Sequence, residues 1–442
     1  MPVALEITLA SERLDEGTPE ERAAFGLFTI RTLHASLTEG FDFYLKGYRP
    51  GPLVSGYHAG EWFAWNWWRL RWEPRSKVAD WALAHRMPSI GEGYVWPNIT
   101  IFSDGVRTAL ISEPSIRPDA KPFRYVGSSA VVVPSSLWEE AVDTYVPQIL
   151  GRLRNGGIAQ TNLDRLWADV LAERADPAIS ERRRLEALLG RDPDLIEDDT
   201  VERLLADADQ LGMAAIGEAA ANRAHVGAQE RTPLTATEFE ELAQSRGHDA
   251  SSRDAVRLDA DTPLPRGALI PAWRLGVDAA RALRAQERLE TGPIVDSRLA
   301  EMAGTRAAVL NDRDSGGGSL SFVLDRRQAS SRLVLRSKWH TGRRFDLARL
   351  IGDRLIGEPA PLHPATRAYT YRQKAQRAFA GEFLSPFEVV DEMLAGDYDD
   401  EERRHEVADH FDVSSKTIDT LLMNHGRLER EDPEQDFDIA AA

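Results

Sequence analysis

The spacing of hydrophobic residues along the chain changes near residue 146. Before this point, the runs GYVWPNITIFSDG and SSAVVVPSS contain β-branched and aromatic residues and are bounded by Gly, Pro, Ser and Asp, as short strands are. After it, hydrophobic residues recur at positions i, i+3, i+4 and i+7, which is the spacing of one face of a helix. We therefore predict a β-rich domain over residues 1–145, with some helix, followed by a helical region.

The helical region contains five predicted helices and extends to about residue 245. Their sequences are PQILGRLRNGG, NLDRLWADVLAER, SERRRLEALLG, TVERLLADADQLGMAAIGEAAANR and LTATEFEELAQSRG. In the last of these, Thr235 or Thr237 precedes Glu240 and is expected to cap the helix. The polar stretch that follows contains Pro and Gly, so we predict that a linker completes a middle region over residues 146–265.

The last part of the chain mixes strands with helices. SLSFVLD and SRLVLRS have the pattern of short strands, and SGGGS at 315–319 predicts a flexible turn. Helical spacing recurs in PAWRLGVDAARALRAQERL, RRFDLARLIGDRLIG, TYRQKAQRAFAGEFL, PFEVVDEML, EERRHEVADHF and SKTIDTLLMNHG. Residues 429–442 are acidic and are predicted to form a disordered tail. The predicted fold class is α+β with several domains.

Composition narrows the choice of function. The 442 residues include no cysteine, which excludes disulfides, thiolate zinc sites, iron–sulfur clusters and a cysteine nucleophile. Neither a membrane-length apolar run nor a secretory leader is evident, so we expect a cytoplasmic protein without a membrane partner. The phosphate-loop, Rossmann and nucleophile-elbow motifs are missing as well.

Charge is unevenly distributed along the sequence. The net charge is −17, which argues against extensive wrapping by nucleic acid. Residues 325–377 nevertheless contain 13 Lys and Arg against four Asp and Glu, whereas residues 397–438 contain 15 Asp and Glu against five Lys and Arg. A basic segment is thus followed by an acidic one, and either could be a solvated face or a partner-binding surface.

One basic helix carries a recognisable motif. The sequence RRFDLARLIGDRLI, residues 343–356, resembles the catalytic helix of the ImmA/IrrE metallopeptidase family, which has the form R-F-x-L-A-H-E-x-G-H. Phe345, Leu347, Ala348 and Gly352 match that form. Arg349, Leu350 and Asp353 stand where the family has its first His, its Glu and its second His.

The resemblance extends to both sides of this helix. AARALRAQERLETGPIVDSRLAEMAG is similar to the family's opening helices, and QRAFAGEFLSP is similar to its A-x-x-F-A-x-x-L-L-x-P helix. VADHFDVSSKTIDTLLMNHGRL is similar to its closing segment. The resemblance implies a zincin-like domain over residues 266–428 that ends in helix-turn-helix-like helices.

The replaced motif positions cannot carry the family's chemistry. A protonated guanidinium such as that of Arg349 offers no lone pair to a metal, and Leu350 cannot accept a proton from water. Asp353 alone supplies one oxygen ligand. The family takes a third ligand, a Glu, from a later helix, and the corresponding window 371–377 (YRQKAQR) contains no carboxylate. We therefore expect no catalytic residue at this motif, and no bound metal or cofactor in the protein.

Two interpretations of the basic residues remain open. Arg349 and Asp353 lie four residues apart on one helix face and could form an ion pair. Alternatively, the former peptide cleft could be a cationic cleft that binds a phosphate backbone, a nucleotide or an acidic peptide. The residues of this predicted basic cleft are Arg343, Arg344, Arg349, Arg372, Lys374 and Arg377.

Three further patterns have more than one interpretation. The segment His405–His410 contains two histidines five residues apart, which does not fit a zinc helix, and a solvated acidic helix is the alternative. The helices around Val413 could read DNA or could be a packed helix pair. The Trp-rich stretch could stack on bases or a partner, or could belong to the core; its residues are Trp65, Trp67, Trp68, Arg69, Arg71 and Trp72.

These observations lead to three hypotheses. The resemblance implies a bacterial mobile-element, prophage or defence context, and the replaced motif favours a non-catalytic regulatory protein that binds a protein partner. The second hypothesis is an active metallopeptidase or other hydrolase that cleaves a repressor-like partner with a non-standard site. The third is a nucleic-acid-binding component of a larger assembly.

Overall fold

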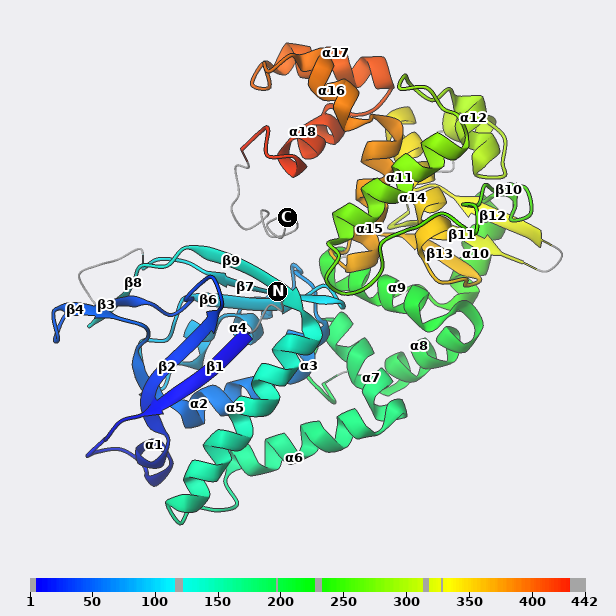
Figure 1. The fold of residues 1–442 in the computed structure, drawn as a ribbon. Coiled ribbons are helices and arrows are strands. Elements are labelled where there is room, and N and C mark those ends of the chain that lie inside the picture. Colours follow the sequence, from blue (N-terminus) through cyan, green and yellow to red (C-terminus); the bar gives the residue numbers. More distant parts are fainter. Residues whose placement is uncertain are drawn as a thin grey trace. The chain divides into compact units, whose positions relative to one another are not determined.

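The computed structural model describes residues 5–115, 122–195, 198–226, 233–312, 318–326 and 329–429. The described residues form two compact units, which divide between Asp198 and Asp199. Together they give a mixed α+β protein, as predicted (Figure 1). The predicted tail at 429–442 lies outside the described residues beyond Glu429, and most of the predicted SGGGS turn lies outside them too.

In its described residues, the first unit has three small antiparallel sheets of three strands each. The first sheet has the order β1-β2-β5, the second β4-β3-β8 and the third β6-β7-β9. Strands β6 and β9 confirm the two strands predicted from their β-branched residues. The strands are β1 (Leu5–Ser11), β2 (Phe25–Thr32), β3 (Gly40–Asp42), β4 (Gly47–Arg49), β5 (Leu53–Ser55), β6 (Ile99–Ser103), β7 (Arg107–Ser112), β8 (Phe123–Tyr125) and β9 (Ser129–Pro134).

Helices enclose one large core in this unit. The Trp-rich stretch forms α2 and α3, and most of its indole rings pack into this core beside Trp138 and Trp167. A tryptophan ring buries a large apolar area, so this density of rings supplies much of the unit's hydrophobic stabilisation. The helices are α1 (Pro19–Ala23), α2 (Gly56–Trp65), α3 (Trp67–Trp72), α4 (Trp81–His85), a 3-10 helix (Met87–Ile90), α5 (Ser135–Asn155), α6 (Asn162–Ala175) and α7 (Pro177–Leu188).

The second unit begins with three helices, α8 (Asp198–Leu211), α9 (Met213–Val226) and α10 (Ala236–Arg246). The sequence predicted α8 and α9 as one helix, and the chain breaks at Gly212, which has φ +95°. Glycine adopts positive φ without steric cost, so it ends one helix and starts the next. Thr235 caps α10 through Glu238, not Glu240, in a reciprocal capping box.

The second unit also contains a four-stranded antiparallel sheet with the order β10-β12-β11-β13. Strands β11 (Ser321–Asp325) and β12 (Ser330–Val334) confirm the two predicted strands, and β13 (Leu362–Ala365) pairs with β11. Within the segment predicted as a linker, β10 (His248–Ser251) pairs with β12. Four polar and small residues give no alternating signal, so only the partner strand reveals this edge strand.

Helix α14 (His340–Ile356) carries the motif residues and is largely buried inside this unit. It contacts α11, α12, α13, α15, β11 and β13, which explains why it is buried on nearly every side. The remaining helices are α11 (Ala272–Gln286), α12 (Asp296–Met302), α13 (Ala308–Asn311), α15 (Tyr371–Leu384), α16 (Phe387–Leu394), α17 (Glu401–Phe411) and α18 (Ser415–Asn424). Within the described part of the chain, no helix is both long enough and apolar enough to cross a bilayer.

Candidate functional site

The motif positions on α14 lie in the interior. Arg349, Leu350 and Asp353 are each at most 3% exposed. Helix α15 approaches α14 closely at Gly352, where an added Cβ would meet the Phe379 ring at 2.6 Å. The absence of a side chain at Gly352 therefore allows the two helices to touch at this position.

Asp353 is the centre of a buried polar network. Arg372 donates two hydrogen bonds of 2.6 Å to its two carboxylate oxygens, and His363 Nδ1 lies 2.9 Å from Oδ2. Gln376 donates a further bond of 2.6 Å to Oδ1. Burial alone would raise the pKa of Asp353, but Arg372 and His363 hold that pKa well below its usual range. The carboxylate is therefore charged, and both of its oxygens are in use.

Arg349 donates its closest hydrogen bonds to neutral acceptors, and the Asp346 carboxylate lies 3.9 Å from its Nη1. Its Nη2 donates to the Thr366 carbonyl at 2.6 Å and to Gln373 Oε1 at 2.5 Å. Burial, with a smaller effect from Arg377, lowers the pKa of Arg349 to about 9, so the group stays protonated at neutral pH. The ion pair considered from the sequence is replaced by another, because Asp353 pairs with Arg372 instead.

Two glutamines on α15 complete the network. Gln373 accepts from the Thr366 backbone N–H at 2.8 Å and donates to the Pro364 carbonyl at 3.1 Å. Gln376 donates to the same carbonyl at 3.0 Å. Both amides lie in the window 371–377 at the start of α15. They fix Arg349 and Asp353 in place and add no charge.

Sequence reasoning missed two members of this region. His363 comes from β13, and its contact with Asp353 depends on the sheet packing against α14. Glu218 on α9 is 6% exposed and accepts a hydrogen bond of 2.7 Å from Thr370, at the start of α15. Burial raises the pKa of Glu218. A lone acidic residue in the alanine-rich run AAIGEAAA was the available signal, since an unpaired carboxylate is costly to bury.

The residues of the predicted basic cleft lie in three different places in the structure. Arg349 and Arg372 belong to the buried network, and Arg377, half-buried, donates to the Ala368 carbonyl at 3.0 Å. Lys374 is also half-buried. Arg343 turns elsewhere and donates to the carbonyls of Val309 and Ser337.

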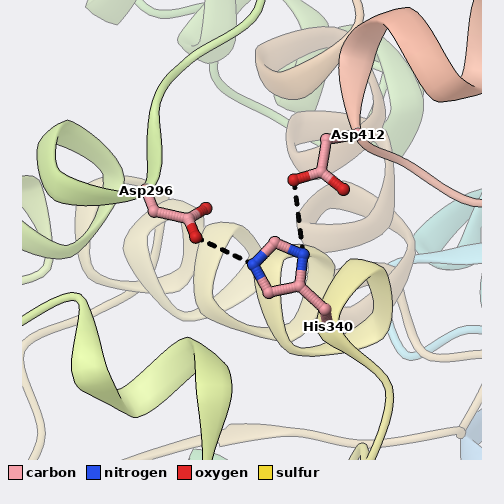
Figure 2. Close-up of side chains that lie close together, drawn as sticks. All are labelled: Asp296, His340 and Asp412. Carbon is pink, nitrogen blue, oxygen red and sulfur yellow. Dashed lines mark hydrogen bonds and ion pairs between the residues drawn. The ribbon is translucent and has the colours of Figure 1, made fainter.

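Arg344 reaches a third location, at the beginning of α14. There His340 lies between two carboxylates (Figure 2). Its Nε2 is 2.8 Å from Asp296 Oδ2, and its Nδ1 is 3.3 Å from Asp412 Oδ2. Arg344 forms ion pairs with both carboxylates. Among the described residues, Asp296, His340 and Asp412 are the one group of His and carboxylates whose ligand atoms lie close enough to share a metal ion.

The Trp-rich stretch is largely internal. Trp67, Trp68 and Arg69 are buried, and Trp68 Nε1 donates a bond of 2.6 Å to Glu173. Arg69 pairs with Glu73 at 2.7 Å in the same interior. Trp65, at 56% exposure, is the ring that α2 presents to solvent.

The other members of the stretch, Arg71 and Trp72, contact each other. The Arg71 guanidinium lies 3.8 Å from the centroid of the Trp72 ring and pairs with Glu139. Both side chains are half-buried. These contacts leave them less available to a nucleic-acid base than Trp65 is.

Helices α17 and α18 pack as a pair. Ala408 and Phe411 are buried, Ser414 caps α18, and the turn at Val413 points into the core. The exposed face includes Glu402, Glu406 and Asp409, with Lys416 on α18. His405 and His410 are exposed as well. An acidic face of this kind repels phosphate.

Comparisons with models of protein families, with curated proteins and with solved structures give no match.

Proposed function

We propose that this chain is a non-catalytic regulatory protein that binds a protein partner, and that residues 266–428 form a pseudo-metallopeptidase domain similar to the ImmA/IrrE family. A bacterial mobile-element, prophage or defence system is the context that the family resemblance suggests. One observation carries the proposal. The three motif positions, Arg349, Leu350 and Asp353, are buried. The Arg349 guanidinium is hydrogen-bonded to Gln373, and the Asp353 carboxylate is hydrogen-bonded to Arg372 and Gln376.

A catalytic zinc site needs three ligands with free lone pairs and one open position for water. Here the single carboxylate at the motif already accepts hydrogen bonds from Arg372, Gln376 and His363. A zinc ion would have to displace Arg372 from a buried pair, which leaves a guanidinium without a counter-charge at a cost of several kcal/mol. The arrangement favours a structural role for these residues over hydrolysis.

A surface of the first unit supports partner binding. The hairpin of β3 and β4 exposes a run of large apolar side chains at its tip and along β4, namely Phe43, Tyr44, Leu45 and Tyr48, with exposures between 46% and 82%. Soluble monomers rarely gather exposed apolar groups in one place, and aromatic side chains contribute strongly to protein interfaces. We assign this hairpin, rather than the buried basic residues, as the contact surface.

Elemental analysis tests the non-catalytic part of the proposal. The Asp353→Asn and His340→Gln variants should be purified beside the natural chain, because the second removes a separate cluster with metal ligands. We expect zinc content to be independent of Asp353. About one zinc per chain that remains in His340→Gln and disappears in Asp353→Asn would overturn the proposal.

Pull-down from the native host tests the partner-binding part. A Tyr44→Ser/Tyr48→Ser double variant should lose the captured partner, because it removes two exposed rings without touching the core. The matched control is Leu171→Ser, which changes a 46% exposed residue of α6. Equal capture by the natural chain and the double variant would contradict the assignment of the hairpin.

A further inference from the structure

Three elements that are distant in the sequence meet at the beginning of α14. Asp296 is the first residue of α12, His340 is the first residue of α14, and Asp412 follows the last residue of α17. One ligand atom from each lies within 4.8 Å of the other two. Figure 2 shows the imidazole pointing between the two carboxylates. The side chains are 28–43% exposed, so water and small ions have access.

The ligand set has a clear chemical preference. One imidazole nitrogen and two carboxylate oxygens form a borderline set that zinc accepts readily, with bond lengths of about 2.0–2.2 Å. Ligands on a tetrahedral ion at these lengths are roughly 3.4 Å apart. The 2.8 Å contact uses His340 Nε2 and the 3.3 Å contact uses Nδ1, and one ion can take only one of these nitrogens. Because one ligand atom from each residue lies within 4.8 Å of the other two, side-chain rotations that bring both carboxylates to the same nitrogen admit an ion. Magnesium and calcium prefer all-oxygen sites with more ligands.

Arg344 contacts both carboxylates, and its Nε lies 3.3 Å from Asp412 Oδ2, the oxygen that also faces His340. Its position is fixed by the Ile294 carbonyl at 2.7 Å and the Asp412 carbonyl at 3.1 Å. It pairs with Oδ1 of Asp296, while Oδ2 of that carboxylate faces His340. Ligating carboxylates in metal sites are commonly oriented by an outer hydrogen bond in this way. Two carboxylates against one guanidinium also leave one negative charge for a cation to balance.

We propose that Asp296, His340 and Asp412 bind one zinc-class divalent cation, with its remaining position open to water or to a partner's side chain. The ion fastens the turn between α17 and α18 to the starts of α12 and α14. This site is separate from the motif on α14, and the inference does not depend on the proposed function. Its role is structural, since an ion shared by three elements stabilises the arrangement that forms the site.

Calorimetric titration of the chelator-treated full chain with Zn²⁺ tests the site. We expect one ion per chain, and His340→Gln should weaken binding by more than the roughly 10- to 100-fold that loss of an outer-shell partner causes. Mg²⁺ should not compete at equal concentration. His405→Gln is the matched control, since His405 is an exposed histidine on α17 that also has an aspartate nearby.

A second measurement guards against a variant that fails to fold. The melting temperature of the natural chain and of His405→Gln should rise with added Zn²⁺, and that of His340→Gln and Asp412→Asn should not. No zinc binding by the natural chain, or equal binding by His340→Gln, would show that the cluster is an ion-pair network only. Either result overturns this inference and leaves the non-catalytic proposal intact, because that proposal concerns Asp353.

Discussion

Replacing Asp353 with Asn should destabilise the second unit strongly. The change removes a buried negative charge that faces Arg372 in a two-bond contact and accepts further bonds from Gln376 and His363. Removing one partner of a buried ion pair costs about 3–5 kcal/mol, because the remaining charge is left without compensation. Total stabilities of about 5–15 kcal/mol make this a large fraction. For a unit of this size the melting temperature should fall by roughly 6–20 °C.

Urea unfolding and thermal circular dichroism at pH 7 measure the loss. The control is Asp409→Asn, which removes an exposed carboxylate of α17 and should change stability by less than about 0.5 kcal/mol. An Asp353→Asn/Arg372→Gln double variant should lose less than the sum of the single variants, because the two charges interact directly. A loss below about 1 kcal/mol for Asp353→Asn would refute the buried network as the reason for the motif's residues.

The same variant gives a pH signature. The folded pKa of Asp353 is lowered, so its contribution to stability is fully present above the unfolded value of about 3.9 and is lost as the pH falls below it. The gap in stability between the natural chain and Asp353→Asn should therefore narrow below about pH 4. A constant gap across that range would mean that the charge of Asp353 is not what stabilises the fold.

Three further predictions concern individual side chains. Trp68→Ala should cost about 3–5 kcal/mol in chemical unfolding, whereas Trp65→Ala, which changes an exposed ring, should cost less than 1 kcal/mol, about the scale of ordinary surface substitutions. Glu218 has a raised pKa, so the folded state holds its proton more tightly, and the free energy of unfolding should decrease as the pH rises above about 4. Glu218→Gln should abolish this pH dependence in urea unfolding midpoints measured from pH 4 to 7. Burial lowers the pKa of His58, but hydrogen bonds to Glu61 and Glu21 outweigh this effect and raise the pKa. The stabilisation that protonated His58 gives the folded state should therefore be lost as the pH rises above about 6.5. The free energy of unfolding of His58→Gln, measured across the same pH range, should lack this loss.

Local patterns predicted much of the secondary structure. The β-branched runs at β6, β9, β11 and β12 and the periodic apolar positions of α6, α7 and α10 specify their own conformation, because one buried face is enough to define each element. The ends of the helices and strands were predicted less accurately than their existence. Helix α5 begins at Ser135, and Gly212 divides a periodic run that has no other break. Strand β10 depends on a partner about 80 residues away in the sequence.

For the candidate sites too, the sequence predicted some features, and others depend on the tertiary fold. The residue types at Arg349, Leu350 and Asp353 were visible in the sequence, and they were enough to argue against a zinc ligand set there. The identity of their neighbours was not visible, because Arg372 and His363 reach Asp353 from a helix and a strand that only the tertiary fold brings together. The charge count of the basic segment predicted a cleft, yet it could not show that several of these arginines satisfy backbone carbonyls.

The packing around α14 also restricts how this sequence could change. An Arg349→His substitution alone removes one of the two donors to Gln373 Oε1 and leaves only the Thr366 backbone N–H. Asp353→His alone places an imidazole against the Arg372 guanidinium. Each step toward a metal-binding helix thus lowers stability before any ligand set is complete. The residues are epistatic, and a metal-binding helix at this position would require several coordinated substitutions on α14 and α15 rather than one.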